Sequence, residues 1–300
     1  MDHHDLTQRL HHVAVTTVTP MRKDGTVDLA AIAPQVEAMT AGGIRILVPC
    51  GNTGEFASLG EDEARAVVEA TVAAAPDGTT VIAGVGGASV TAAGLAEHAA
   101  AVGADAVMVH HPTHTYIDPD ALVRYYERIL QATDLGMVVY KRGPELSDQV
   151  IAELVLHEQV VGVKYAVNDL NSFANLVDEA GTSACAWLCG TAERFAPFFH
   201  IAGAVGFTSG IANFAPQLPV AMYDAMAAGD VAGAMELRRQ LTPFEQLRAS
   251  RNNALNVPAV KEAMRQLSMD SGMLRDPLQQ PSPDERELIA TMLGDLGLSV

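Results

Sequence analysis

The sequence predicts an α/β protein, a (β/α)8 TIM barrel with an appended C-terminal helical bundle, and three observations lead to that fold class. Eight short apolar runs follow one another between residues 13 and 210, longer amphipathic segments separate them, and residues 215–300 show largely helical patterns. Runs that are apolar on both faces are typical of buried parallel strands. Eight strand–helix units over about 200 residues favour a closed barrel over an open sheet.

The predicted strands are each too short for a helix and are bounded by turn residues. In order they are VAVTTVTP (13–20), IRILVPC (44–50), TVIAGVG (80–86), DAVMVHHP (105–112), GMVVYK (136–141), VVGVK (160–164), AWLCG (186–190) and AVGFTSG (204–210). Segments between them, such as DLAAIAPQVEAMTAGG (28–43) and DALVRYYERILQATD (120–134), have helical periodicity. We therefore expect a catalytic barrel over residues 1–214 and a helical extension over residues 215–300.

The net charge is −17, from 19 Lys and Arg against 36 Asp and Glu. An acidic chain without a basic stripe is a poor binder of nucleic acid and of anionic membrane surfaces. An anionic substrate would therefore need a locally positive site. No apolar run reaches about 18 residues, so no transmembrane helix is expected, and the first residues lack the apolar segment of a secretory signal. We expect a cytoplasmic protein.

The three cysteines, Cys50, Cys185 and Cys189, have no spacing typical of a disulfide framework, which fits a reducing compartment. Cys185 and Cys189 are four residues apart, a distance that a metal-binding pair could have. No second Cys or His pair follows at zinc-finger spacing, so we interpret both residues as buried strand thiols.

Chemistry in such a barrel is expected where the strands end. Of the four lysines, Lys23 lies in a polar turn and Lys261 is predicted on the surface of a C-terminal helix. Lys164 ends the sixth run, directly after the uncharged residues VVGV. Burial lowers the pKa of an ammonium group, and a neutral amine can attack a carbonyl. Lys164 is therefore the candidate nucleophile, and the alternative is an ion pair with Asp169 or Glu55.

Tyr140 ends the fifth run, next to Lys164 in the predicted barrel. Its hydroxyl group could transfer protons, and the alternative is a tyrosine packed in the barrel with a satisfied hydroxyl. Strand alternation directs Lys141 toward the helices and returns Arg142 to the side of Tyr140.

Residues Gly51, Asn52, Thr53, Gly54 and Glu55 follow the second run. Two glycines would let backbone N–H groups turn inward and form a cradle for a carboxylate, with hydroxyl donors beside them. The alternative is a tight turn that uses glycine for its backbone angles.

His110, His111 and His114 cluster after the fourth run and raise the possibility of a metal-dependent barrel lyase. A catalytic metal would need ligands at other strand ends, and none of the fifth to eighth runs ends with a histidine. We expect no metal and interpret the three residues as polar loop histidines. The N-terminal histidines are predicted to lie in a flexible start: His3, His4, His11 and His12.

Four features, taken in order, resemble the dihydrodipicolinate synthase and N-acetylneuraminate lyase family of class I aldolases over about residues 11–295. TTVTP (16–20) is similar to the family's first strand, residues 51–55 to its carboxylate-binding loop, Tyr140 to its proton-shuttling tyrosine, and GVK (162–164) to the strand with its Schiff-base lysine. The resemblance implies an imine on Lys164, no other cofactor, and a homotetramer in which residues 110–116, including Tyr116, lie near a neighbour's site.

Within that family the motifs are most similar to those of the 5-dehydro-4-deoxyglucarate dehydratases. They are NTGEFASL (52–59), TAE (191–193) with FAP (195–197), Tyr140 with Arg142, and Thr208 and Ser209 with Asn213. The chain also departs from the family patterns. Lys141, Tyr165 and HHP (110–112) replace an Asn, an Asp and a P-P-Y segment, and Glu145 stands where the synthase has an Arg that grips its aldehyde substrate.

These motifs predict a dehydratase and decarboxylase that acts on a sugar-derived 2-oxo acid. Lys164 would attack the C2 ketone, Tyr140 would move protons, and Gly51, Asn52, Thr53 and Gly54 would hold the C1 carboxylate. Contacts to the distal end of the substrate are expected from Arg142, Thr208, Ser209 and Asn213. The alternatives are a pyruvate-dependent aldolase or dihydrodipicolinate synthase-like enzyme, and a non-catalytic 2-oxo acid binder on the same barrel.

Overall fold

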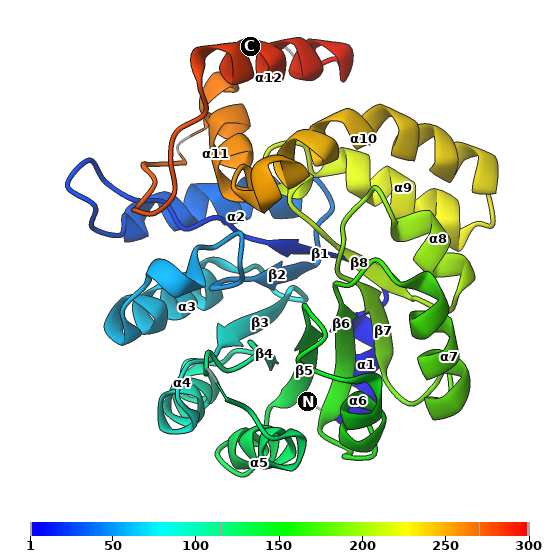
Figure 1. The fold of residues 1–300 in the computed structure, drawn as a ribbon. Coiled ribbons are helices and arrows are strands. Elements are labelled where there is room, and N and C mark those ends of the chain that lie inside the picture. The colour runs from blue at the N-terminus through cyan, green and yellow to red at the C-terminus, as the bar shows by residue number, and fades with distance from the viewer. Residues whose placement is uncertain (1, 115, 270, 299–300) are drawn as a thin grey trace.

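The computed structural model describes residues 2–114, 116–269 and 271–298, and it contains a closed barrel of parallel strands in sequence order, β1 to β8. β1 pairs with both β2 and β8, which closes the ring (Figure 1). The predicted fold class is confirmed. The strands are β1 (Val13–Thr16), β2 (Ile46–Val48), β3 (Thr80–Val85), β4 (Ala106–Val109), β5 (Gly136–Lys141), β6 (Val160–Tyr165), β7 (Ala186–Cys189) and β8 (Gly206–Ser209).

Every strand is buried on both faces, so alternate side chains belong to two different cores. One core fills the barrel with residues such as Ile46, Met108 and Leu188. The other lies between barrel and helices and contains Trp187 and Phe207. The free thiols of Cys185, directly before β7, and of Cys189, at its end, are buried as predicted. This alternation decides which strand-end side chains can reach a site inside the barrel mouth.

A helix follows each strand and covers the outside of the barrel (Figure 1). These helices are α2 (Ile32–Ala41), α3 (Glu61–Ala74), α4 (Ser89–Ala101), α5 (Pro119–Leu130), α6 (Asp148–Leu154), α7 (Leu170–Ala180), α8 (Ala196–Ile201) and α9 (Gln217–Ala227). α9 follows β8 and shares the outer core through Met222 and Met226. The predicted boundary between residues 214 and 215 therefore falls before the eighth barrel helix. Within the described ranges, no helix is both long and apolar enough to span a membrane.

Three further helices, α10 (Val231–Asn253), α11 (Asn256–Gln266) and α12 (Pro283–Asp295), follow the barrel. α10 ends in a break, because Arg251, Asn252 and Asn253 all have left-handed backbone angles, with φ of 51°, 56° and 66°. Asparagine tolerates this conformation better than most residues do. The break turns the chain sharply, so that α11 begins beside the last regular turn of α10. Figure 1 shows both helices above β1 and β8.

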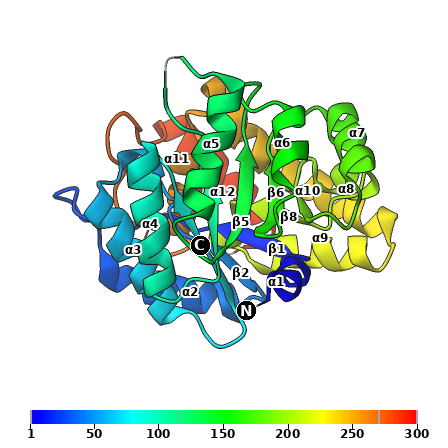
Figure 2. The same ribbon diagram turned by 90° about the horizontal axis from the view of Figure 1, so that it is seen from below.

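The N-terminal residues are not the flexible segment that the sequence predicted, because they form α1 (His3–Arg9). The side chain of Asp2 caps the helix, and Arg9 lies in its last turn, where a positive charge complements the helix dipole. Leu6 and the next-turn Leu10 are buried in the inner core, near the first residues of β5 and β6. Figure 2 shows α1 across the end of the barrel where the strands begin. The leucines thus close that end.

Replacing Leu10 with Ala should test this role of α1. Leu10 is fully buried, so its truncation should leave a cavity and lower the free energy of unfolding by about 2–5 kcal/mol. Leu156→Ala is the matched control, because that side chain is 81% exposed and should change stability by less than about 0.5 kcal/mol. Chemical denaturation of both variants measures the difference. Equal stabilities would mean that α1 does not contribute to the barrel core.

Candidate active site

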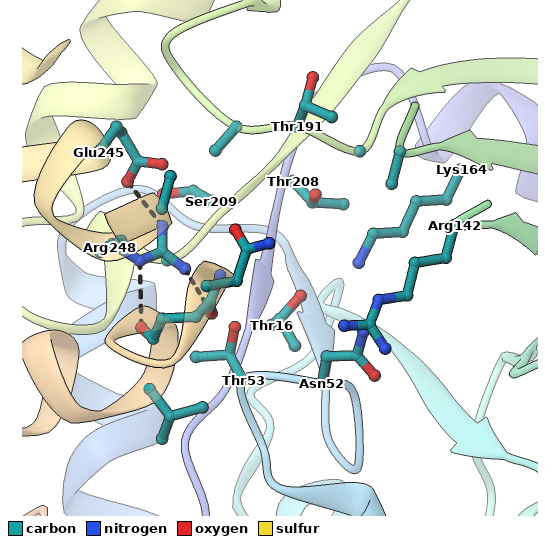
Figure 3. Close-up of a pocket in the computed structure, with 18 of the residues that line it drawn as sticks. Thr16, Asn52, Thr53, Arg142, Lys164, Thr191, Thr208, Ser209, Glu245 and Arg248 are labelled. Carbon is teal, nitrogen blue, oxygen red and sulfur yellow. Dashed lines mark hydrogen bonds and ion pairs between the residues drawn. The ribbon is translucent and has the colours of Figure 1, made fainter. Parts of the chain in front are cut away.

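A cavity of about 500 Å³ opens at the carboxyl ends of the strands. Figure 3 shows its lining, which combines strand-end residues with residues from α10 and α11. Among the lining residues are Thr16, Asn52, Thr53, Tyr140, Arg142, Lys164, Thr191, Thr208, Ser209, Glu245, Arg248 and Asn256. The cavity therefore contains several of the residues that the sequence predicted and a second group that it did not.

Lys164 and Tyr140 lie opposite each other in the pairing of β5 with β6. The Nζ atom of Lys164 is 4.4 Å from the centre of the Tyr140 ring, and the residue is only 4% exposed. Burial lowers the pKa of Lys164 to about 8, and the positive charges of Arg248 and Arg142 add to that shift. The side chain has no hydrogen bond or ion pair with the rest of the described chain. Burial, the lowered pKa and the lack of a partner are the properties expected of a nucleophilic amine, so Lys164 remains the candidate nucleophile.

The ion pair considered as an alternative for Lys164 does not form. Asp169 caps α7 instead, since its carboxylate accepts from the backbone N–H and hydroxyl of Ser172. Glu55 pairs with Lys261. Lys141 points away from the cavity as predicted, and its Nζ atom donates to the carbonyl oxygen of Leu146 at 2.5 Å.

The hydroxyl oxygen of Tyr140 accepts a hydrogen bond of 2.9 Å from the side-chain amide of Asn52. Because the oxygen acts as acceptor in that bond, its own hydrogen stays available for a group in the cavity. Burial raises the pKa of Tyr140 to about 12, so the residue stays a neutral phenol at physiological pH. Asn52 thus orients the hydroxyl group of Tyr140, which remains the candidate proton-transfer group next to the candidate nucleophile Lys164.

The loop after β2 uses its glycines differently from the prediction. Left-handed backbone angles occur at Cys50 and Glu55, with φ of 58° and 59°, and not at Gly51 or Gly54. The glycines are required by close packing instead. A Cβ atom on Gly51 would lie 2.3 Å from Cγ2 of Thr16, and one on Gly54 would lie 2.8 Å from a backbone oxygen. Neither glycine lines the cavity. Because they have no side chain, the loop can pack closely against the end of β1.

Thr53 is the buried tip of this loop in the cavity lining. In the described part of the chain, the backbone N–H groups of Thr53 and Gly54 have no acceptor. Only Thr53 of the two lines the cavity, so its N–H and its hydroxyl group are the donors that could bind a carboxylate there.

Lys261 is not on the surface as predicted, because its side chain is only 3% exposed and its Nζ atom lies 2.5 Å from the carboxylate of Glu55. Nζ also donates to the backbone oxygen of Met273 at 2.7 Å. Glu55 is itself buried, and the pair joins the loop after β2 to α11. The helical extension thereby holds the loop that carries Thr53.

Thr208 and Ser209 both line the cavity at the end of β8. The Ser209 hydroxyl donates to the carboxylate of Glu193 and accepts from the backbone N–H of Ala212. Burial, together with the negative charge of Glu245, raises the pKa of Glu193 and favours its protonated form. Thr208 is therefore the freer of the two hydroxyl groups for a substrate contact.

Asn213, predicted to contact substrate, lies outside the cavity lining. Its side-chain oxygen accepts from the N–H of Val18 at 2.9 Å, and its amide donates to the backbone oxygens of Thr16 and Gly210. The side chain is fully used in joining the loop after β8 to the loop after β1, so the prediction of a substrate contact is corrected to a structural role.

The three histidines after β4 all border a second cavity, but His110 and His114 make different contacts. His110 is buried, stacks on Phe56 with ring centres 4.4 Å apart, and bonds through Nε2 to the backbone oxygen of Cys50. Burial lowers its pKa to about 4, so the ring is neutral at pH 7. His114 contacts the backbone oxygen of Tyr116, which is 84% exposed. Across the described residues, no group of three or more His, Cys, Asp or Glu side chains could hold a metal ion.

Sequence reasoning missed the residues that α10 and α11 add to the cavity. Arg248 has a side chain that is 6% exposed and forms an ion pair of 2.6 Å with Glu245. Figure 3 shows Arg248 on one side of the cavity, with Lys164 and Arg142 on the other. A Glu–Arg pair three residues apart on a helix resembles a surface ion pair, so the linear sequence carried no signal for this placement.

Comparisons with known proteins agree with this geometry. The family model described as the dihydrodipicolinate synthetase family matches residues 9–295. The chain belongs to this family. A 4-hydroxy-tetrahydrodipicolinate synthase from Acidiphilium cryptum is 36% identical over 96% of this chain and 99% of its own length.

Solved structures give the same result. Dihydrodipicolinate synthase from Oceanobacillus iheyensis has a TM-score of 0.95 at 36% identity, and the match covers 99% of both chains. The synthase from Bacillus clausii also has a TM-score of 0.95, at 39% identity, over 98% of this chain and 100% of the other. The predicted family is confirmed, and the chain is a Schiff-base lyase of the dihydrodipicolinate synthetase family.

The pH dependence of imine formation should report the lowered pKa of Lys164. The neutral amine is the reactive form, so labelling by pyruvate and cyanoborohydride should rise with pH and reach half its maximum near pH 8. Mass spectrometry of peptides from pH 6 to pH 10 measures the labelling, with Lys164→Ala as the unlabelled control. A midpoint near the ordinary lysine value of about 10.4 would contradict the buried, unpaired placement. So would labelling of Lys141.

Replacing Lys261 with Met should leave the buried carboxylate of Glu55 without its partner. Removing one member of a buried pair costs about 3–5 kcal/mol, so the variant should be clearly less stable and should bind 2-oxo acids more weakly through the displaced Thr53 loop. The matched control is the double variant Lys261→Met with Glu55→Gln, which removes both charges and should recover part of the stability. Thermal unfolding measures the stability of the single and the double variant. Wild-type stability of the single variant would show that the pair does not secure the loop.

Proposed function

We propose that this Schiff-base lyase dehydrates and decarboxylates a dicarboxylic, sugar-derived 2-oxo acid. The observation that carries the proposal is the charge of the cavity around the unpaired Lys164. Its lining includes four cations, Arg142, Lys164, Arg194 and Arg248, and two carboxylates that are each already paired. In a chain of net charge −17, this local excess of positive charge suits a substrate with more than one carboxylate.

The chemistry would begin with attack of the Lys164 amine on the C2 ketone. With a pKa of about 8, roughly one Lys164 side chain in ten is neutral at pH 7. The resulting iminium ion withdraws electrons, so that a C3 proton becomes acidic and the C4 hydroxyl can leave as water. Loss of the distal carboxylate as CO₂ would follow, and hydrolysis of the imine would release the product and regenerate the amine.

Tyr140 would transfer protons in these steps, because its ring lies against Lys164 and its hydroxyl keeps a free hydrogen. The C1 carboxylate would bind to the hydroxyl and the backbone N–H of Thr53, which lines the cavity. The proposed substrate has a carboxylate at each end, which agrees with the positive charge of the cavity lining.

A second candidate is the synthase reaction itself, favoured by the names of relatives such as the Acidiphilium cryptum protein. We place it second because Glu145 occupies the position, five residues after Tyr140, where the resemblance implies an aldehyde-binding Arg. Glu145 borders a neighbouring cavity of about 790 Å³ and not the one that contains Lys164. A carboxylate there would not attract an anionic aldehyde.

The homotetramer that the resemblance implies, and the cytoplasmic location that the sequence predicts, remain proposals. Residues 110–116, expected near a neighbour's site, border that second cavity through His110, His111 and His114.

Assay of two reactions separates the candidate functions. Incubation with 5-dehydro-4-deoxyglucarate should release CO₂, while pyruvate with aspartate semialdehyde should give no useful condensation. Lys164→Ala should abolish the first activity, because no other group can replace the covalent electron sink. Efficient condensation with the semialdehyde, and no CO₂ from the sugar acid, would support the synthase instead. Imine trapping without either turnover would indicate a 2-oxo acid binder.

A further inference from the structure

Arg248 is a fixed cation in the cavity wall. Its Nε atom donates to the backbone oxygen of Asn256 at 3.2 Å, and Nη2 donates to the side-chain oxygen of the same residue at 3.1 Å. Nη1 donates to Glu245 at 2.6 Å. A guanidinium group has five N–H donors, so within the described structure one N–H on each terminal nitrogen is unused. Two terminal N–H groups are the donors that a carboxylate can take together.

The end of β8 is shaped to receive this guanidinium group. A Cβ atom on Gly210 would lie 2.3 Å from Nη2 and 2.4 Å from Cζ and Nη1 of Arg248, so only glycine leaves room. The φ of Gly210 is −96°, a value that other residues adopt, and the requirement is therefore one of space. The left-handed residues 251–253 bring Asn256 back against Arg248. Strained backbone of this kind is often found at functional sites.

Arg142, the residue that the sequence favoured for the distal end of the substrate, is held less firmly. It is exposed, it borders both cavities, and no hydrogen bond or ion pair to another described residue fixes it. Arg248 is almost fully buried, and it has a larger effect than Arg142 on the pKa of Lys164. A desolvated and prepositioned guanidinium group binds an anion more strongly than an exposed one.

We propose that Arg248, and not Arg142, binds the distal carboxylate of the substrate and so selects dicarboxylic over monocarboxylic 2-oxo acids. This assignment rests on the imine at Lys164 proposed above. Lys164 would hold C2 of the substrate and Thr53 its C1 carboxylate, while the distal end would reach the α10–α11 junction, since all of these parts line the same cavity. Glu245 uses its bond to hold Arg248 in place, and Glu193, kept protonated by burial, adds no second negative charge there.

Matched probes test the assignment without the natural substrate. 2-Oxoadipate and 2-oxohexanoate have the same length and differ in the distal carboxylate. In the wild-type enzyme, cyanoborohydride should trap 2-oxoadipate on Lys164 at lower probe concentrations than 2-oxohexanoate requires. Arg248→Met should reduce that preference by about 10- to 100-fold, the effect of one charge-assisted carboxylate contact. The ratio between probes is the readout, because loss of Arg248 also raises the pKa of Lys164 for both.

Two further variants keep the test decisive if Arg248→Met folds poorly. Arg248→Lys retains the charge and should keep part of the preference. Gly210→Ala retains Arg248 but displaces its guanidinium group, and should lower the preference. Arg239→Met is the control, since Arg239 forms the same i,i+3 pair with Glu236 on α10 but is 60% exposed and outside the cavity lining. Its preference should equal that of the wild type.

The opposite outcomes are equally specific. An unchanged probe ratio in Arg248→Met and Gly210→Ala would overturn the assignment, and a loss confined to Arg142→Met would transfer the role to Arg142. An equal loss of trapping for both probes would show that Arg248 acts only through the pKa of Lys164 or through the C1 carboxylate. If neither probe nor pyruvate is trapped on Lys164 in the wild type, the proposed Schiff-base function itself fails, which is a separate result.

Discussion

Lys164 keeps its amine in the cavity lining without an ion pair to any carboxylate of the described residues, and the proposed chemistry of the site depends on that condition. Burial lowers its pKa from 10.5 to about 8, which corresponds to about 3 kcal/mol of stability lost by the folded protein at neutral pH. The lowered pKa also makes the free energy of unfolding depend on pH. Between about pH 8 and pH 10.5 the unfolded chain binds the extra proton, so the cost is complete below that window and disappears above it. The closed barrel, with its two cores, tolerates this cost.

The neighbours of Lys164 are arranged so that they do not neutralise it. Glu55, a carboxylate on the loop beside the site, is paired with Lys261 from α11, and Asp169 is used as a helix cap. Asp148 is paired with Lys141, which points outward from the barrel. Each of these carboxylates thus has a partner other than Lys164, and the lining keeps an excess of positive charge for an anion that enters.

The helical extension is part of the active site and not only an addition to the barrel. Through Lys261 it fixes the loop that carries Thr53, and through Arg248 and Asn256 it forms the wall opposite Lys164. In a barrel enzyme the strand-end loops usually change with the substrate. Here the junction between α10 and α11 also borders the cavity, and it places the positive charge of Arg248 in the wall.

The sequence by itself determined the barrel, its strands, and the positions of Lys164, Tyr140 and Lys141, because strand length and two-residue alternation are local properties of the chain. It also led to the family through motifs within single loops. The tertiary structure decided which polar groups were already satisfied. Asn213, Lys261 and Ser209 have partners that are 195, 206 and 16 residues away in the chain. It also decided that α1 closes the barrel and that Arg248 faces the cavity, since both depend on contacts between segments far apart in sequence, whose hydrogen bonds and packing no local pattern encodes.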